Sequence, residues 1–165
     1  MINIWPHKLY KFFYSEMTDE ISKIFVAVRK YCLFSEKRKP ESSDDHLLEL
    51  LGGRLEPSET PFQGLMRELQ EEDLSEILAN KVKSLDLQPK EILVNHEKHS
   101  IYKVNITQDE YNNLRHNPNE SYGFQLIEKS VVDDKKTLEN SIHKFTNKTG
   151  KIFIQLNMLY ERLHL

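Results

Sequence analysis

The sequence predicts a single domain of the α+β class over residues 1–165, in which helices flank a β-sheet. Three observations support this prediction. The length suits one domain with one hydrophobic core. Runs of β-forming residues recur at separate places along the chain. Stretches with helical spacing of apolar residues, or with helix-start signals, lie between and after these runs.

The expected strands occupy residues 23–29, 31–37, 47–51, 91–96, 99–106 and 123–128. The runs at 91–96 and 99–106 form a hairpin with Glu97-Lys98 in the turn, which places His96 and His99 at the surface rather than in a metal site. Expected helices cover 61–79, a short segment after Thr107, 134–147, and 151–163. The last carries an apolar stripe that is expected to join the core: Ile152, Leu156, Leu159 and Leu163.

Composition narrows the classes of function. Charged residues make up 30% of the chain and the net charge is −3, so bulk charge indicates no nucleic-acid-binding surface. No apolar run reaches the roughly 18 residues of a membrane span, and the N-terminus lacks a secretory apolar segment. Cys32 is the only cysteine, which favours a reducing, cytoplasmic compartment. A short strand at 12–14 would serve as an edge strand or as an arm that contacts a second copy in a homodimer.

A glycine loop that leads into a helix organises the chain. Gly52 and Gly53 let the backbone approach a ligand closely. Thr60 is suited to be the N-cap of the helix, Pro61 is suited to its first position, and Gln63 completes a capping box. The pattern then continues to Ala79, with Asn80 as a left-handed cap.

Three carboxylates follow on one face of this helix. Glu68, Glu71 and Glu72 stand at positions i, i+3 and i+4, so their side chains project together. Clustered oxygen ligands of this kind suit Mg²⁺, which binds through carboxylates and substrate phosphates. A solvated acidic face is the alternative explanation, and the preceding glycine loop favours the metal site.

The stretch resembles the Nudix box, G-x5-E-x7-R-E-U-x-E-E-x-G-U, in which U is a bulky apolar residue. The matching residues are Gly53, Glu59, Arg67, Glu68, Leu69, Glu71 and Glu72. The resemblance fails at the end of the box, where Leu74 replaces the glycine and Ser75 replaces the apolar residue. We therefore expect a longer helix than is usual for the family.

This resemblance implies an α/β/α sandwich with a central mixed sheet, and hydrolysis of a diphosphate joined to another moiety with Mg²⁺ or Mn²⁺. The implied metal ligands are Glu68, Glu71, Glu72 and the carbonyl of Gly52. Arg67 would face away from the metal and pair with Glu59, and the implied catalytic residues are Glu59, Arg67, Glu68, Glu71 and Glu120. Glu128 is the second candidate for a general base.

Substrate contacts are implied for Gly53, Arg54 and Arg38, although a solvated side chain is the favoured explanation for Arg38. The substrate would be a small nucleotide: a nucleoside triphosphate, a nucleotide sugar such as ADP-ribose, a dinucleoside polyphosphate or capped RNA. Tyr122 and Phe124 would serve core packing rather than base stacking. Because the box is incomplete, the alternative is a catalytically weak nucleotide-binding module.

Overall fold

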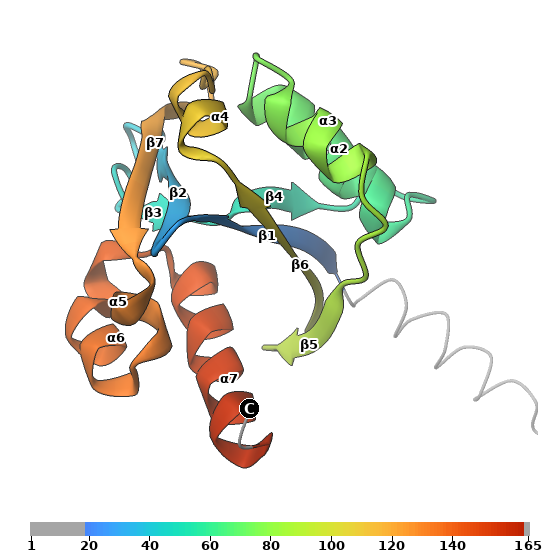
Figure 1. Ribbon diagram of the computed structural model, residues 1–165. Coiled ribbons are helices and arrows are strands. Elements are labelled where there is room, and N and C mark those ends of the chain that lie inside the picture. The colour runs from blue at the N-terminus through green and yellow to red at the C-terminus, as the bar shows by residue number, and fades with distance from the viewer. Residues whose placement is uncertain (1–18, 164–165) are drawn as a thin grey trace, which may run out of the picture.

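Seven strands form one mixed sheet at the centre of the molecule (Figure 1). The computed structural model describes residues 19–163, and side chains up to residue 157. The strand order is β3-β2-β1-β6-β5, with β4 paired to β1 and β7 paired to β2. The strands are β1 (Glu20–Val28), β2 (Tyr31–Lys37), β3 (Leu48–Glu49), β4 (Leu51–Arg54), β5 (Lys90–Val94), β6 (Glu97–Ile106) and β7 (Ser121–Glu128). β1 and β6 are parallel, and the other pairs are antiparallel.

Helices cover both faces of this sheet. α2 (Pro61–Glu72) and α3 (Ile77–Lys83) lie on one face, and α5 (Lys129–Asp133), α6 (Lys135–Ser141) and α7 (Asn147–Leu163) lie on the other (Figure 1). The short α4 (Gln108–Asn112) follows β6, and a 3-10 turn at Ile142–Lys144 precedes α7. The predicted α+β fold, a mixed sheet flanked by helices, is confirmed.

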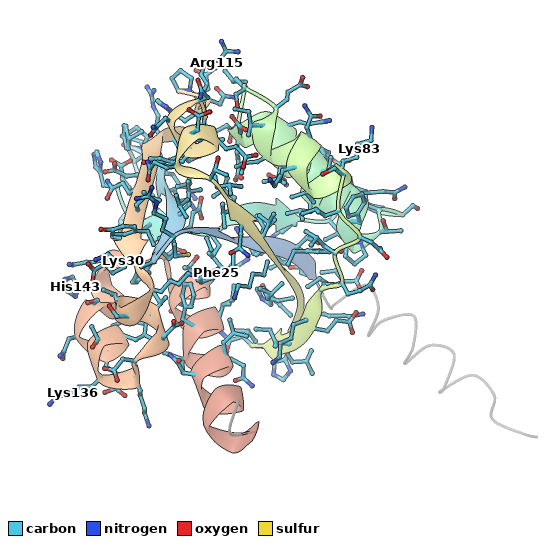
Figure 2. The ribbon with its side chains drawn as sticks, in the orientation of Figure 1. Phe25, Lys30, Lys83, Arg115, Lys136 and His143 are labelled. Atoms are coloured by element: carbon cyan, nitrogen blue, oxygen red, sulfur yellow. The ribbon has the colours of Figure 1, made fainter. Side chains whose placement is uncertain are left out.

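Alternation along β1 explains the two layers of the core. Ile24, Val26 and Val28 are buried against α2 and α3, whereas Phe25 points to the opposite face and packs edge-on against Phe153 of α7 (Figure 2). Each strand residue therefore contributes to only one layer. Lys23 lies two residues before Phe25 in β1, so its side chain is on the same face of the sheet, which is the face that α7 covers.

The predicted single helix over 61–79 is wrong, because the chain breaks after Glu72. Asp73 is fully buried, and its carboxylate accepts hydrogen bonds from the backbone N–H groups of Ser75, Leu78 and Arg115 at 3.0–3.1 Å. These bonds hold the chain out of helical geometry. Glu76, not Asn80, adopts the left-handed conformation before α3. The start of the helix is as predicted, since Thr60 and Gln63 form both bonds of the capping box.

Other boundaries also differ from the predictions. The hairpin turn is formed by Asn95 and His96, which both have positive φ, so Glu97 and Lys98 belong to β6. His99 consequently moves from the surface into the core, where it is fully buried. The last helix begins at Asn147 rather than after Gly150, because Thr146 accepts hydrogen bonds from the N–H groups of Thr149 and Gly150. The helix expected over 134–147 is instead the short α6 and the 3-10 turn.

Some expectations cannot be compared with the structure. The strand at 12–14, with the homodimer arm it suggested, and the side chains of Leu159 and Leu163 lie outside the described part. Ile152 and Leu156 do pack in the core as predicted. Within residues 19–163, no helix is both long and apolar enough to cross a membrane.

Candidate active site

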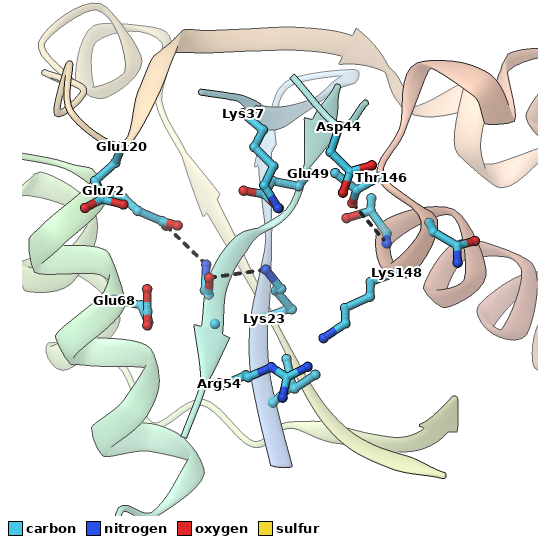
Figure 3. Close-up of a pocket in the computed structure, with 15 residues that line it drawn as sticks. Lys23, Lys37, Asp44, Glu49, Arg54, Glu68, Glu72, Glu120, Thr146 and Lys148 are labelled. Atoms are coloured by element: carbon cyan, nitrogen blue, oxygen red, sulfur yellow. Dashed lines mark hydrogen bonds and ion pairs between the residues drawn. The ribbon is translucent and has the colours of Figure 1, made fainter. Parts of the chain in front are cut away.

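A charged cavity of about 420 Å³ lies between α2 and the start of α7, with β4 and β1 between them (Figure 3). Carboxylates from α2 line one side, and the rest of the lining carries both cations and carboxylates, among them Lys23, Arg54 and Lys148 and the acidic Asp44 and Glu49. The described residues that line it are Ile21, Lys23, Lys37, Asp44, Glu49, Gly52, Gly53, Arg54, Glu68, Glu72, Glu120, Thr146, Asn147, Lys148 and Thr149. Residues that are far apart in the sequence thus meet at one place.

Gly52 connects the strand to the acidic helix. Its φ of +120° and its contact with Ser22 explain why glycine is needed here, since a Cβ would lie 2.1 Å from the Ser22 carbonyl oxygen. The Gly52 N–H donates to Oε2 of Glu72 at 3.1 Å. The glycine loop predicted from the sequence is therefore a strand that binds directly to a carboxylate of α2.

Gly53 lets the second carboxylate lie over the strand backbone. A Cβ at this position would be 2.6 Å from Cδ and Oε1 of Glu68. Glu68 and Glu72 therefore both face β4, one over each glycine. This arrangement depends on two adjacent residues without side chains, as the spacing of the sequence suggested.

Arg67 fixes these carboxylates in place. Its Nε and Nη2 donate to the two oxygens of Glu59 at 2.9 and 3.0 Å, which is the predicted pair in bidentate form. Its Nη2 also donates to the Arg54 carbonyl at 2.9 Å, tying α2 to β4. The expectation that Arg67 faces away from the metal ligands needs correction, because Nη1 donates to Oε1 of Glu68 at 3.0 Å.

Glu71 occupies a different position from the other two carboxylates. Its side chain is half-exposed, lies 3.8 Å from Nη1 of Arg67, and does not line the cavity. Among the described residues, no group of three or more His, Cys, Asp or Glu side chains is arranged to hold a metal ion. The oxygen atoms that meet at β4 come from Glu68, Glu72 and the Gly52 carbonyl.

Lys23 is a cavity residue that the sequence analysis did not identify. It is buried, with 6% of its surface exposed, and its Nζ donates to the carbonyls of Leu50 and Gly52 at 3.1 and 3.2 Å. The carbonyl expected to bind metal thus accepts a hydrogen bond from an ammonium group. The feature of the sequence that could have identified it is a lysine within the apolar run of β1.

Burial raises the pKa of both carboxylates that face β4. Desolvation raises the pKa of Glu72 well above its ordinary value, while the charge of Lys23 opposes this shift. Desolvation also raises the pKa of Glu68, against the hydrogen bond from Arg67. By contrast, the hydrogen bond from Arg67 lowers the pKa of Glu59, which keeps that carboxylate ionised.

The remaining candidates divide into two groups. Glu120 and Arg54 line the cavity, as Glu72 does (Figure 3). Arg38 does not line it; its guanidinium donates to the Pro118 carbonyl and lies over the ring of Tyr122. Glu128 is at the other end of β7, where it pairs with Lys30 at 3.4 Å. Of the two candidates for a general base, the structure brings only Glu120 to the cavity.

Comparison with known proteins identifies the architecture. No family model and no curated protein matches the sequence. Solved structures do match: a MutT NUDIX hydrolase from Burkholderia pseudomallei has a TM-score of 0.54 and 13% identity, over 84% of this chain and 97% of that one. An Ap4A hydrolase from C. elegans has a TM-score of 0.53 and 13% identity, over 87% and 98%. The chain has a Nudix-like fold.

A larger protein shares the same architecture. A bifunctional NMN adenylyltransferase/ADP-ribose pyrophosphatase from Francisella tularensis, in complex with AMP and a manganese ion, has a TM-score of 0.56 and 15% identity. The match covers 96% of this chain, which spans about half of that protein, 48% of its length. The Nudix-like fold thus occurs both alone and as part of a longer chain.

The cavity has donors that fit a hard divalent cation. Glu68 and Glu72 supply carboxylate oxygens, and Gly52 supplies a carbonyl oxygen that no side chain at that residue can obstruct. A Cβ at Gly53 would fill the space beside the Glu68 carboxylate, whereas a Cβ at Gly52 would meet the backbone of β1. The charge of a cation would also favour the ionised forms of the two carboxylates.

Proposed function

We propose that residues 1–165 act as one cytoplasmic hydrolase domain that cleaves a diphosphate joined to another moiety, using water and Mg²⁺ or Mn²⁺. One observation carries this proposal: Glu68 and Glu72 face adjacent glycines of β4 at the edge of a charged cavity. The Nudix-like fold supports it, because hydrolases of phosphoanhydrides with this fold are among the matching structures.

In this proposal Glu68, Glu72 and the Gly52 carbonyl hold the cation. The cation supplies charge neutralisation for the diphosphate oxygens and makes phosphorus more susceptible to attack. Arg67 maintains the position of Glu68 and, through Glu59, of the loop before α2. These residues keep the ligand geometry fixed before substrate arrives.

Glu120 is positioned to act as the general base of the reaction. It lines the same cavity as Glu72, and its loop is held by a hydrogen bond from its own N–H to the Asn117 carbonyl at 3.0 Å. Water would form a new bond to phosphorus while the bridging P–O bond breaks, and the proton from water would pass to the carboxylate of Glu120. Replacement by Gln would keep the size of the side chain and remove this proton acceptor.

The test is product release with Mg²⁺ across nucleoside triphosphates, ADP-ribose, dinucleoside polyphosphates, NADH and 5-phosphoribosyl 1-diphosphate. We expect turnover of at least one compound, loss of turnover in EDTA, and its loss in Glu72→Gln with the fold retained. Absence of turnover with every compound at high enzyme concentration would contradict the proposal.

A binding module without turnover is the second candidate, and Lys23 is the observation that favours it. Its ammonium donates to the Gly52 carbonyl, where it competes electrostatically with a divalent cation. A binding module would saturate with nucleotide in calorimetry and leave it intact. The absence of the box glycine at Leu74 no longer favours a binding module, because Asp73 ends α2 without a glycine.

A further inference from the structure

The cavity has a second, basic side opposite the acidic helix. Lys148 in the first turn of α7 extends toward Lys23 and Arg54 (Figure 3). We call these three residues the cationic cluster. They come from α7, β1 and β4, and all three line the same cavity. Their common position suggests an anionic ligand.

The charges of the cationic cluster are incompletely balanced. The ion pairs of the described residues include no carboxylate within 4.0 Å of Lys23, although its side chain is buried. Arg54 and Lys148 share one carboxylate, Glu97, at 3.7 and 3.5 Å. Arg54 has a further partner in Asp19 at the edge of the sheet. Because Arg54 and Lys148 share the single charge of Glu97, and Lys23 is hydrogen-bonded only to carbonyl groups, a bound anion would stabilise this arrangement.

A buried histidine adjoins the same network. His99 pairs with Ile21 in the parallel register of β6 and β1, which places it on the face that bears Lys23. It is fully buried, and neither ring nitrogen has a hydrogen-bond partner in the described structure. Its Nε2 lies 3.4 Å from Glu97. An anion bound by Arg54 and Lys148 would leave Glu97 free to accept a hydrogen bond from His99.

The lining of the cavity also limits the chemistry of the ligand. Ile21 is the only apolar side chain, and no aromatic residue is present among the described lining residues. Nucleobases are usually held by stacking on aromatic or apolar groups. The lining beside Lys148 is polar instead, with the amide of Asn147 and the buried hydroxyls of Thr146 and Thr149, which suits a polyhydroxylated, phosphorylated moiety.

We propose that the cationic cluster binds a phosphate monoester on the second moiety of the substrate. The substrate is then a diphosphate joined to a phosphorylated, non-aromatic group such as a sugar phosphate. The diphosphate half of this inference rests on the proposed function, whereas binding of the monoester phosphate does not.

The first experiment tests monoester binding without any diphosphate. Titration of the metal-free protein in EDTA with ribose 5-phosphate, followed by calorimetry and ³¹P NMR, should give saturable binding that weakens with salt. Neutral ribose should give none. Lys148→Gln should weaken binding about tenfold, since it removes one charged hydrogen-bond donor. Lys148→Arg should restore most of the affinity.

Lys136→Gln is the matched control, because Lys136 projects from α6 away from the rest of the molecule (Figure 2). It should bind ribose 5-phosphate as the wild type does. Failure to saturate at millimolar ligand would overturn the inference, as would equal affinity in wild type and Lys148→Gln when circular dichroism shows both folded. Equal binding of ribose would also overturn it.

Hydrolysis assays separate this inference from the proposed function. With 5-phosphoribosyl 1-diphosphate and Mg²⁺, Lys148→Gln should raise KM about tenfold and leave kcat nearly unchanged. Ribose 5-phosphate binding without hydrolysis of any diphosphate would refute the proposed function alone. Mg²⁺-dependent hydrolysis without ribose 5-phosphate binding would refute the cationic cluster alone.

Discussion

Substitution of Gly53 by alanine should separate catalysis from folding. The new Cβ would lie 2.6 Å from Cδ of Glu68, whereas ordinary contacts begin at 3.4 Å, so the carboxylate must move by about 0.8 Å. A displacement of about 1 Å in a catalytic group can lower the rate about 100-fold. Gly53 has no positive φ, and the clash is with a side chain that can move. The free energy of unfolding should therefore change by only about 1 kcal/mol or less.

Gly52→Ala is the contrasting variant. Its Cβ would meet the backbone oxygen of Ser22 at 2.1 Å, and the residue has a φ of +120°. The backbone strain at Gly52 and the clash with β1, whose backbone is held in the sheet, should together reduce the free energy of unfolding by about 3 kcal/mol or more.

The assay combines thermal and urea unfolding with kcat/KM in Mg²⁺, on the diphosphate substrate found in the panel. Gly53→Ala should unfold like the wild type and lose about two orders of magnitude in kcat/KM. Activity of Gly53→Ala within threefold of wild type would refute the placement of Glu68 at the reaction centre. If Gly53→Ala unfolded at the same temperature as Gly52→Ala, the distinction between the two glycines would be refuted.

Three further predictions address the acidic helix. Because desolvation raises the pKa of Glu72, the metal-free folded protein binds an extra proton, and its stability should fall as pH rises above the ordinary value of 4.5. Glu72→Gln should remove this fall. In urea unfolding with EDTA, the stability of the variant relative to the wild type should therefore increase with pH. A constant difference in stability across the pH range would contradict the raised pKa of Glu72. Arg67→Lys loses the bidentate contact with Glu59, so it should lower kcat/KM at least tenfold and reduce the free energy of unfolding by about 1–3 kcal/mol. A variant with the kinetics of the wild type would argue against a positioning role for Arg67. Asp73→Asn keeps one acceptor oxygen and should cost about 2–3 kcal/mol in urea unfolding, with activity per folded molecule unchanged; unaltered stability would show that these bonds do not maintain the helix break.

The contacts of the predicted box follow from local spacing, which is why sequence reasoning could anticipate them. Thr60 and Gln63 lie within one helical turn, and Arg67 and Glu59 are eight residues apart on the same loop and helix. Local rules also place Glu68 and Glu72 on one face. They do not distinguish Glu71, whose exposure depends on where α2 meets β4.

Features that depend on distant partners could not be predicted in this way. Asp73 ends α2 partly through the N–H of Arg115, which is 42 residues away. Lys23 enters the cavity because β1 pairs with β4 in a register that places it opposite Gly52. His99 is buried because the hairpin turn lies two residues before the expected position. Tyr122, expected in the core, stacks instead on His46 near the surface.

The most direct measurement is an anomalous diffraction map of crystals soaked with Mn²⁺. The account predicts a single strong peak bounded by the carboxylates of Glu68 and Glu72 and the carbonyl of Gly52, with the ammonium of Lys23 displaced from that carbonyl. A map without a peak at this position at saturating Mn²⁺, or with Mn²⁺ only elsewhere on the surface, would contradict it.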